Sequence, residues 1–92
     1  MRTPTIHLGG TGSAELVRQV AEAHEAVVAA RAALCAMWPN GRDYYPQGPQ
    51  AIREAEDEHA ARLRALDGVL SDLTELADVV MTEHLAREAR RA

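Results

Sequence analysis

The chain has 92 residues, enough for one domain at most, and 47% of them are hydrophobic although there is no phenylalanine. A formal charge of −4 and a pI near 5.5 argue against a protein that binds the nucleic-acid backbone, because such proteins need a basic face. With one tryptophan and two tyrosines, a lone helical hairpin would have a thin core. We therefore expect a homo-oligomer, at least a dimer.

Three simpler features narrow the class of protein. Cys35 is the only cysteine, so it has no disulfide partner within the chain, and a small buried side chain is its expected role. No signal peptide, apolar run of membrane-spanning length or polybasic anchor is recognisable, which predicts a cytoplasmic protein with no membrane partner. All ten basic residues are arginine; a GC-rich coding sequence explains this, and so does phosphate recognition by guanidinium groups.

Residues 1–12 are expected to form an extended lead and a glycine-rich turn. Residues 5–8, Thr-Ile-His-Leu, alternate in polarity and predict a short strand. Thr11 or Ser13 is then expected to cap the following helix. A strand, a glycine-rich turn and a helix N-terminus can together hold a phosphate, here through Gly10, Thr11 and Ser13. The pattern lacks the lysine of a P-loop and precedes no second strand, so a simple helix start is the alternative.

Two long helical patterns follow, over residues 13–38 and 49–90, with residues 39–48 as the loop between them. Apolar residues recur at alternating spacings of three and four in both patterns, which is typical of helices packed as a pair. Pro49 suits the first position of the second helix, and Gly68 is a candidate kink. The expected fold is an all-α antiparallel hairpin with a short extended N-terminal segment, assembled into a homo-oligomeric bundle.

The two helices differ in length. At about 1.5 Å per residue the first spans roughly 37 Å and the second nearer 60 Å. Folded back from the loop, the first helix is expected to end its contact near Leu73. Leu76, Val79, Val80 and Leu85 then need other cover, which the N-terminal segment and a neighbouring subunit would provide.

The loop is longer and more aromatic than a helical hairpin requires. Tyr44 and Tyr45 offer faces on which a base can stack, and Arg42 offers a guanidinium fork for phosphate. Asn40, Asp43 and Gln47 offer hydrogen bonds to a ribose or a base edge. The alternative is structural: the tyrosines cap the hairpin core, and Arg42 pairs with Asp43 or another acidic neighbour.

Histidine offers two further possibilities. Glu56 and His59 lie three residues apart, as in the E-x-x-H pair of helical di-iron sites, and the stretch faintly resembles encapsulated ferritin-like proteins. The matching stretch of the first helix, residues 31–38, has no carboxylate for such a site. No hydrolase triad or zinc spacing involves any of the four histidines, so we expect no metal, no cofactor and no enzyme activity.

Two motifs carry a resemblance to a family: TIHLGGT at residues 5–11 and NGRDYYPQG at residues 40–48. Both motifs, separated by one helix, resemble those of small proteins of tailed phages and prophages. In size and hairpin architecture such proteins are similar to phage anti-defence "sponges", which sequester the nucleotide signals of CBASS or Thoeris immunity. That second similarity is architectural and transfers no binding residues.

These observations favour a phage-type anti-defence protein that binds a nucleotide-derived signal, a cyclic ADP-ribose isomer or a cyclic oligonucleotide, without turning it over. Arg42 would hold phosphate, Tyr44 or Tyr45 would stack on the base, and residues 10–13 would donate backbone hydrogen bonds. The glycine-rich turn and the loop lie at opposite ends of a hairpin, so they can share a ligand only between antiparallel subunits. A protein-interaction module is the alternative function, and a ferritin-like metal-binding assembly is the third.

Overall fold

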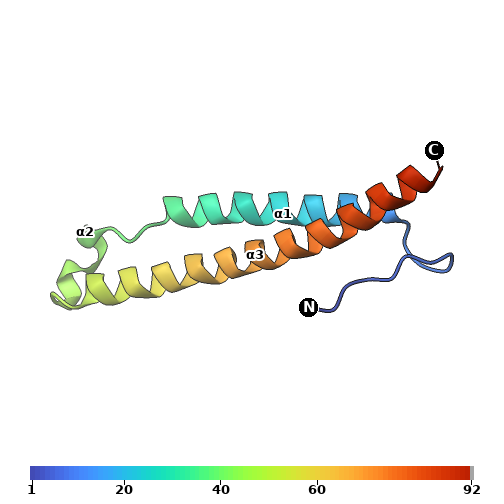
Figure 1. Cartoon of the computed structure of the whole chain (residues 1–92). Coiled ribbons are helices and arrows are strands. Elements are labelled where there is room, and N and C mark those ends of the chain that lie inside the picture. Colours follow the sequence, from blue (N-terminus) through green and yellow to red (C-terminus); the bar gives the residue numbers. More distant parts are fainter. Residues whose placement is uncertain (92) are drawn as a thin grey trace.

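The computed structural model describes residues 1–91, and these form a long helix pair (Figure 1). The elements in chain order are α1 (Ser13–Ala36), α2 (Gly41–Tyr44), a 3-10 helix η1 (Tyr45–Gln47) and α3 (Ala51–Arg91). Helices α1 and α3 run antiparallel, with α2 and η1 at one end and the N-terminal lead at the other. The prediction of an all-α hairpin is confirmed. Among the residues described, no helix has the length and hydropathy of a membrane span.

The start of α1 differs from the capping expected. Gly12 is the N-cap, with extended backbone and no side-chain cap, and its carbonyl oxygen accepts a hydrogen bond from the Leu16 N–H at 3.0 Å. Ser13 is already helical, and its hydroxyl lies 2.9 Å from His84 Nδ1 on α3. Capping requires a non-helical residue, so Ser13 ties the two helices together instead. The predicted cap by Thr11 or Ser13 is therefore wrong.

The segment between the long helices is more regular than the loop expected. The Asn40 side chain caps α2 by accepting from the Arg42 N–H at 3.0 Å, and the chain continues directly into η1. Gly48 then has φ 104° and ψ 168°, a backbone region essentially restricted to glycine. Pro49 belongs to the turn closed by the Ala51 N–H to Gly48 carbonyl bond of 3.3 Å. Pro49 is thus not the first helical residue, because α3 begins at Ala51.

Residues 5–8 form no strand: residues 5–7 have no regular secondary structure, and Leu8 belongs to the turn that follows. A strand needs a neighbouring strand for its ladder of hydrogen bonds, and no strand is present in residues 1–91. The Ile6 carbonyl oxygen instead accepts a hydrogen bond from the Arg87 guanidinium at 3.0 Å. The lead is therefore attached to the C-terminal part of α3 by a side chain.

The register of the helix pair places more of α3 beside α1 than the length argument predicted. Ser13, at the start of α1, meets His84, and Leu34, near its end, meets His59. The contact thus runs from His59 to His84 and does not stop near Leu73. The reason is that α2 and η1 lie beside the first turns of α3, so the partner of α1 begins further along the helix.

The core is as thin as the composition implies. Within the described chain, Val20, Ala55, Val80 and His59 are the buried residues. Cys35 is exposed, contrary to the expectation of a buried thiol. The chain measures 66 × 21 × 20 Å and exposes 6766 Å², whereas a compact monomer of 10.0 kDa exposes about 5,200 Å². The hairpin alone leaves much apolar surface uncovered.

Candidate functional site

The predicted site residues divide between the two ends of the molecule. The predicted loop residues lie at one end of a chain 66 Å long. Asn40 is the N-cap of α2, and α2 and η1 contain Arg42, Asp43, Tyr44, Tyr45 and Gln47. Gly10, Thr11 and Ser13 lie at the other end, where the lead turns into α1 (Figure 1). One chain cannot bring both groups to a single small ligand. Each end is therefore a separate candidate site.

At the loop end, the two tyrosines have different environments. Tyr44 is half-buried and lines a cavity of about 390 Å³ together with Leu34, Met37 and His59. Tyr44 thus caps the end of the core, as the structural alternative proposed. Tyr45 is 77% exposed, so its ring face is open to a partner or ligand.

Several polar side chains of the loop already have a structural role within the chain, and most of the charged groups around them are carboxylates. Asn40 is used as a helix cap, and Gln47 lines a small cleft with Glu54 and Glu58. Arg42 and Asp43 are exposed, and within residues 1–91 neither side chain has a recorded ion pair. Residues 38–58 carry five carboxylates against two arginines. The field at this end therefore opposes the binding of a phosphate.

At the other end, the glycine-rich turn folds around His7. The His7 Nδ1 accepts a hydrogen bond from the Gly9 N–H at 3.2 Å, and its carbonyl oxygen accepts from the Gly10 N–H at 3.1 Å. A Cβ at Gly10 would lie 2.9 Å from the His7 ring, so glycine permits this close approach. The turn leads to the N-terminus of α1, whose first N–H groups have no side-chain cap.

Two arginines of α3 join this turn, and sequence reasoning missed both. A cavity of about 330 Å³, here called the Arg cleft, is lined by the glycine-rich turn, the α1 N-terminus and the end of α3. Its volume is at the lower end of small-ligand sites. The lining residues are Ile6, His7, Leu8, Gly10, Gly12, Ser13, Arg87 and Arg91. The length of the second helical pattern was the signal that could have found them, because a second helix this long must end beside the N-terminal segment.

The charges around the Arg cleft favour an anion. Arg87 donates to Glu83 at 3.1 Å and to the Ile6 carbonyl oxygen, and Arg91 donates to Glu88 at 3.3 Å. Each guanidinium has five N–H donors, so donors remain on both. The α1 N-terminus adds the positive end of the helix dipole. Residues 1–18 and 83–91 together carry five arginines against three carboxylates.

The acidic residue nearest the start of α1, Glu15, forms an ion pair with Arg18. Glu15 accepts hydrogen bonds from Arg18 at 2.6 and 2.8 Å. The hydrogen bond from Arg18 lowers the pKa of the Glu15 carboxyl to about 2. This carboxylate is therefore paired on α1 and does not present an isolated negative charge to the cleft.

The geometry of His59 disfavours the metal hypothesis. His59 is 2% exposed, its Nε2 donates to the Leu34 carbonyl oxygen at 2.6 Å, and its Nδ1 lies 3.3 Å from the Arg62 guanidinium. Glu56 accepts from the Trp38 indole N–H at 3.2 Å. Among residues 1–91, no three His, Cys, Asp or Glu side chains are grouped to hold a metal ion. Both nitrogens that a metal would need are already in use.

No protein-family model, curated protein or solved structure matches the chain.

Proposed function

We propose that this chain is a non-catalytic binding protein that sequesters a small, phosphorylated, nucleotide-derived signal. It would act in the cytoplasm of a bacterial host, as phage anti-defence sponges do. It would do so as a homo-oligomer, with the phosphate held in the Arg cleft. The observation that carries the proposal is the convergence of Arg87, Arg91 and the uncapped N-terminus of α1 on one small cavity. Guanidinium forks and helix N-terminal N–H groups are two standard means of binding phosphate.

In the proposed site the phosphate is bound by Arg87 and Arg91 in the Arg cleft and not by Arg42 at the loop end. An isolated arginine among five nearby carboxylates is a poorer anion site than two arginines beside a helix N-terminus. Tyr45, with its exposed ring, remains the residue suited to stack on a base. Of the three residues predicted at this end, Gly10 and Ser13 line the Arg cleft, whereas Thr11 does not.

A protein-interaction module is the second candidate function. Met37, Trp38 and Tyr45 are 66%, 45% and 77% exposed at the loop end, and tryptophan and tyrosine are frequent binding hot spots. This surface is compatible with a protein partner, whereas the Arg cleft favours a small anion.

A thermal-shift screen of the purified chain tests the proposed function. The wells contain cyclic dinucleotides, cyclic ADP-ribose isomers, linear nucleotides or pyrophosphate, and iron and zinc in separate wells. A ligand at one hundred times its Kd stabilises the folded state by about 2.7 kcal/mol, a shift of many degrees for a small domain. We expect a shift with one nucleotide class and recovery of that nucleotide unchanged. No shift with any phosphorylated compound would contradict the proposal and favour the protein-interaction module.

A further inference from the structure

An apolar stripe with exposed members runs along the middle of α3, and Met81 and Leu85 are exposed beyond it at 41% and 59%. Leu66, Val69, Leu73, Leu76 and Val79 recur at spacings of three and four, which places them along one stripe. We call these residues the α3 stripe. Val69 and Val79 are 44% and 43% exposed, and the three leucines are half-buried. The stripe lies on either side of Ser71, the midpoint of α3 (Ala51–Arg91).

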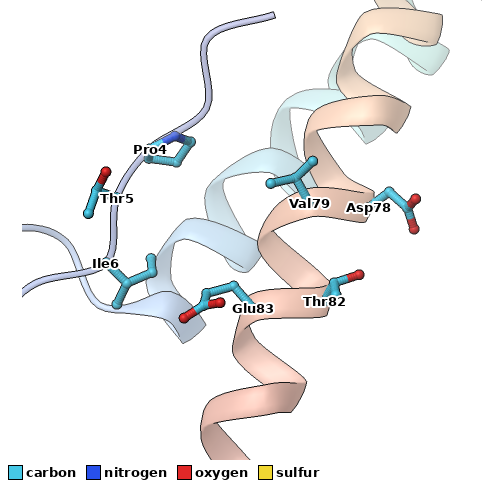
Figure 2. Close-up of a pocket in the computed structure, with 7 residues that line it drawn as sticks. All are labelled: Pro4, Thr5, Ile6, Asp78, Val79, Thr82 and Glu83. Atoms are coloured by element: carbon cyan, nitrogen blue, oxygen red, sulfur yellow. The ribbon is translucent and has the colours of Figure 1, made fainter.

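The stripe continues into an open groove at the N-terminal end. This groove, about 540 Å³ in volume, lies between the extended lead and α3 (Figure 2). Val79 lines the helical side, and Pro4 and Ile6 line the other. Glu83 projects toward the lead, whereas Asp78 projects away from it. Because Ile6 also lines the Arg cleft, the stripe, the groove and the cleft form one continuous surface.

The two ends of the chain have opposite charge. Residues 38–58 carry an excess of three carboxylates, and residues 1–18 with 83–91 carry an excess of two arginines. Two parallel copies would place like charges together at both ends. Two antiparallel copies would place the acidic loop end of each against the basic end of the other.

The exposed area is also sufficient for such contact. The chain exposes 6766 Å², about 1,500 Å² more than a compact monomer of its mass. A standard stable interface buries about 800 Å² on each partner. The rod therefore has the surplus surface that one further copy would cover.

We infer that a second copy of this chain docks antiparallel on the α3 stripe and completes the Arg cleft with its own loop end. A twofold axis near Ser71 brings the first turns of the partner's α3 opposite the last turns of this one. The partner subunit's Tyr45 then lies beside Arg87 and Arg91. Each ligand site combines the guanidinium groups of one chain with the exposed aromatic ring of the other. The ligand role of Tyr45 depends on the proposed function; the antiparallel docking does not.

Two matched variants test the docking surface by light scattering after size exclusion. Val69→Glu places a charge on the α3 stripe, and Val28→Glu places one at a residue of similar exposure, 47%, on α1. We expect wild type and V28E to be dimers and V69E to be a monomer with unchanged helical circular dichroism. Dimerisation should weaken at 1 M salt, where the screening length is about 3 Å. A monomeric wild type, or a V69E chain that dimerises like wild type, would overturn the inference.

The orientation is tested by replacing Tyr45 with the photoreactive residue benzoylphenylalanine. The labelled chain is mixed with isotope-labelled wild type, irradiated without ligand, and digested for mass spectrometry. The antiparallel dimer predicts cross-links between chains from position 45 to peptides of residues 1–12 or 83–91, absent in the V69E background. Cross-links between chains that join position 45 to the partner's own loop would show a parallel dimer and reject the inference. Neither outcome depends on the ligand, so failure of the proposed function is detected separately.

Discussion

His59 on α3 donates a hydrogen bond of 2.6 Å to the carbonyl oxygen of Leu34, in the last turns of α1. The imidazole is 2% exposed, and the Trp38 ring meets it edge-on at a centroid distance of 5.6 Å. The last carbonyls of a helix lack the usual partner four residues on; the Leu34 carbonyl oxygen accepts from the Met37 N–H at 3.1 Å and takes a second hydrogen bond from the opposite helix. A polar side chain thus takes the place of an apolar core residue at the loop end.

Replacing His59 with leucine should lower the free energy of unfolding by about 1–3 kcal/mol, because a part-buried acceptor loses one of its two donors. The Leu34 carbonyl also accepts from the Met37 N–H at 3.1 Å, which favours the lower part of that range. Urea unfolding at fixed protein concentration measures the change. The exposed Arg64→Ala variant is the control and should change stability by less than about 0.5 kcal/mol. A leucine variant as stable as the control would show that this hydrogen bond adds nothing to stability.

Two glycines should respond to alanine in opposite directions. Gly48 has φ 104° and an extended ψ, so Gly48→Ala should destabilise the chain by about 1–3 kcal/mol. Gly68 is helical and exposed, and a Cβ there meets nothing within 4 Å. Gly68→Ala should therefore stabilise α3 by about 0.5–1 kcal/mol. The two variants are compared by denaturant unfolding, and equal effects of the same sign would contradict this interpretation of the turn.

The ion pair between Arg31 and Asp67 should make stability depend on pH. Arg31 bonds both carboxylate oxygens across the helix pair, at 2.5 and 3.3 Å. These hydrogen bonds lower the pKa of the Asp67 carboxyl below its ordinary value of 3.8. A lowered carboxyl pKa means that the pair stabilises the folded chain above pH 3.8 and that this contribution is lost as pH falls through the folded pKa.

The measurement is thermal unfolding of wild type and Asp67→Asn between pH 2 and 7, with both proteins at the same concentration. Wild type should be the more stable at neutral pH, and the difference should shrink toward the acid limit. Because the pair is exposed, added salt should reduce the difference as well. A difference that is constant with pH would show that the carboxylate charge is not responsible.

The sequence was sufficient for the helix pair because its apolar spacing persists over both segments. It failed where structure depends on a distant neighbour. Residues 5–8 have strand-like alternation, but without a second strand they form no strand, and the Ile6 carbonyl oxygen is bound by Arg87. The short helix α2 had a local signal, since Asn40 can cap it and Asp43 lies in its first turn. The same residue types are also common in turns, so the sequence alone predicts a loop there.

The candidate site was predictable only in part. The glycine-rich turn and the loop were recognisable from composition, and their separation followed from the hairpin. The contribution of Arg87 and Arg91 depends on how far α3 extends past the start of α1, and that register is set by α2 and η1 covering the first turns of α3. Residue types alone do not fix such a register. In this chain the register follows from the two short helices α2 and η1, which precede α3.

Calorimetric titration of the nucleotide that gives the largest thermal shift tests the central claim most directly. The proteins compared are wild type, Arg91→Ala, Arg42→Ala and the control Arg64→Ala. Arg91 is the better probe of the cleft, because its recorded bond within residues 1–91 is to Glu88 of its own helix, whereas Arg87 also anchors the lead.

We predict that R91A weakens binding about tenfold to a hundredfold, as loss of a hydrogen bond to a charged group implies. R64A should bind like wild type, and R42A should retain most of the affinity. The nucleotide should be recovered intact. Full affinity in R91A together with loss of binding in R42A would contradict the Arg cleft, and recovery of a cleaved nucleotide would contradict sequestration.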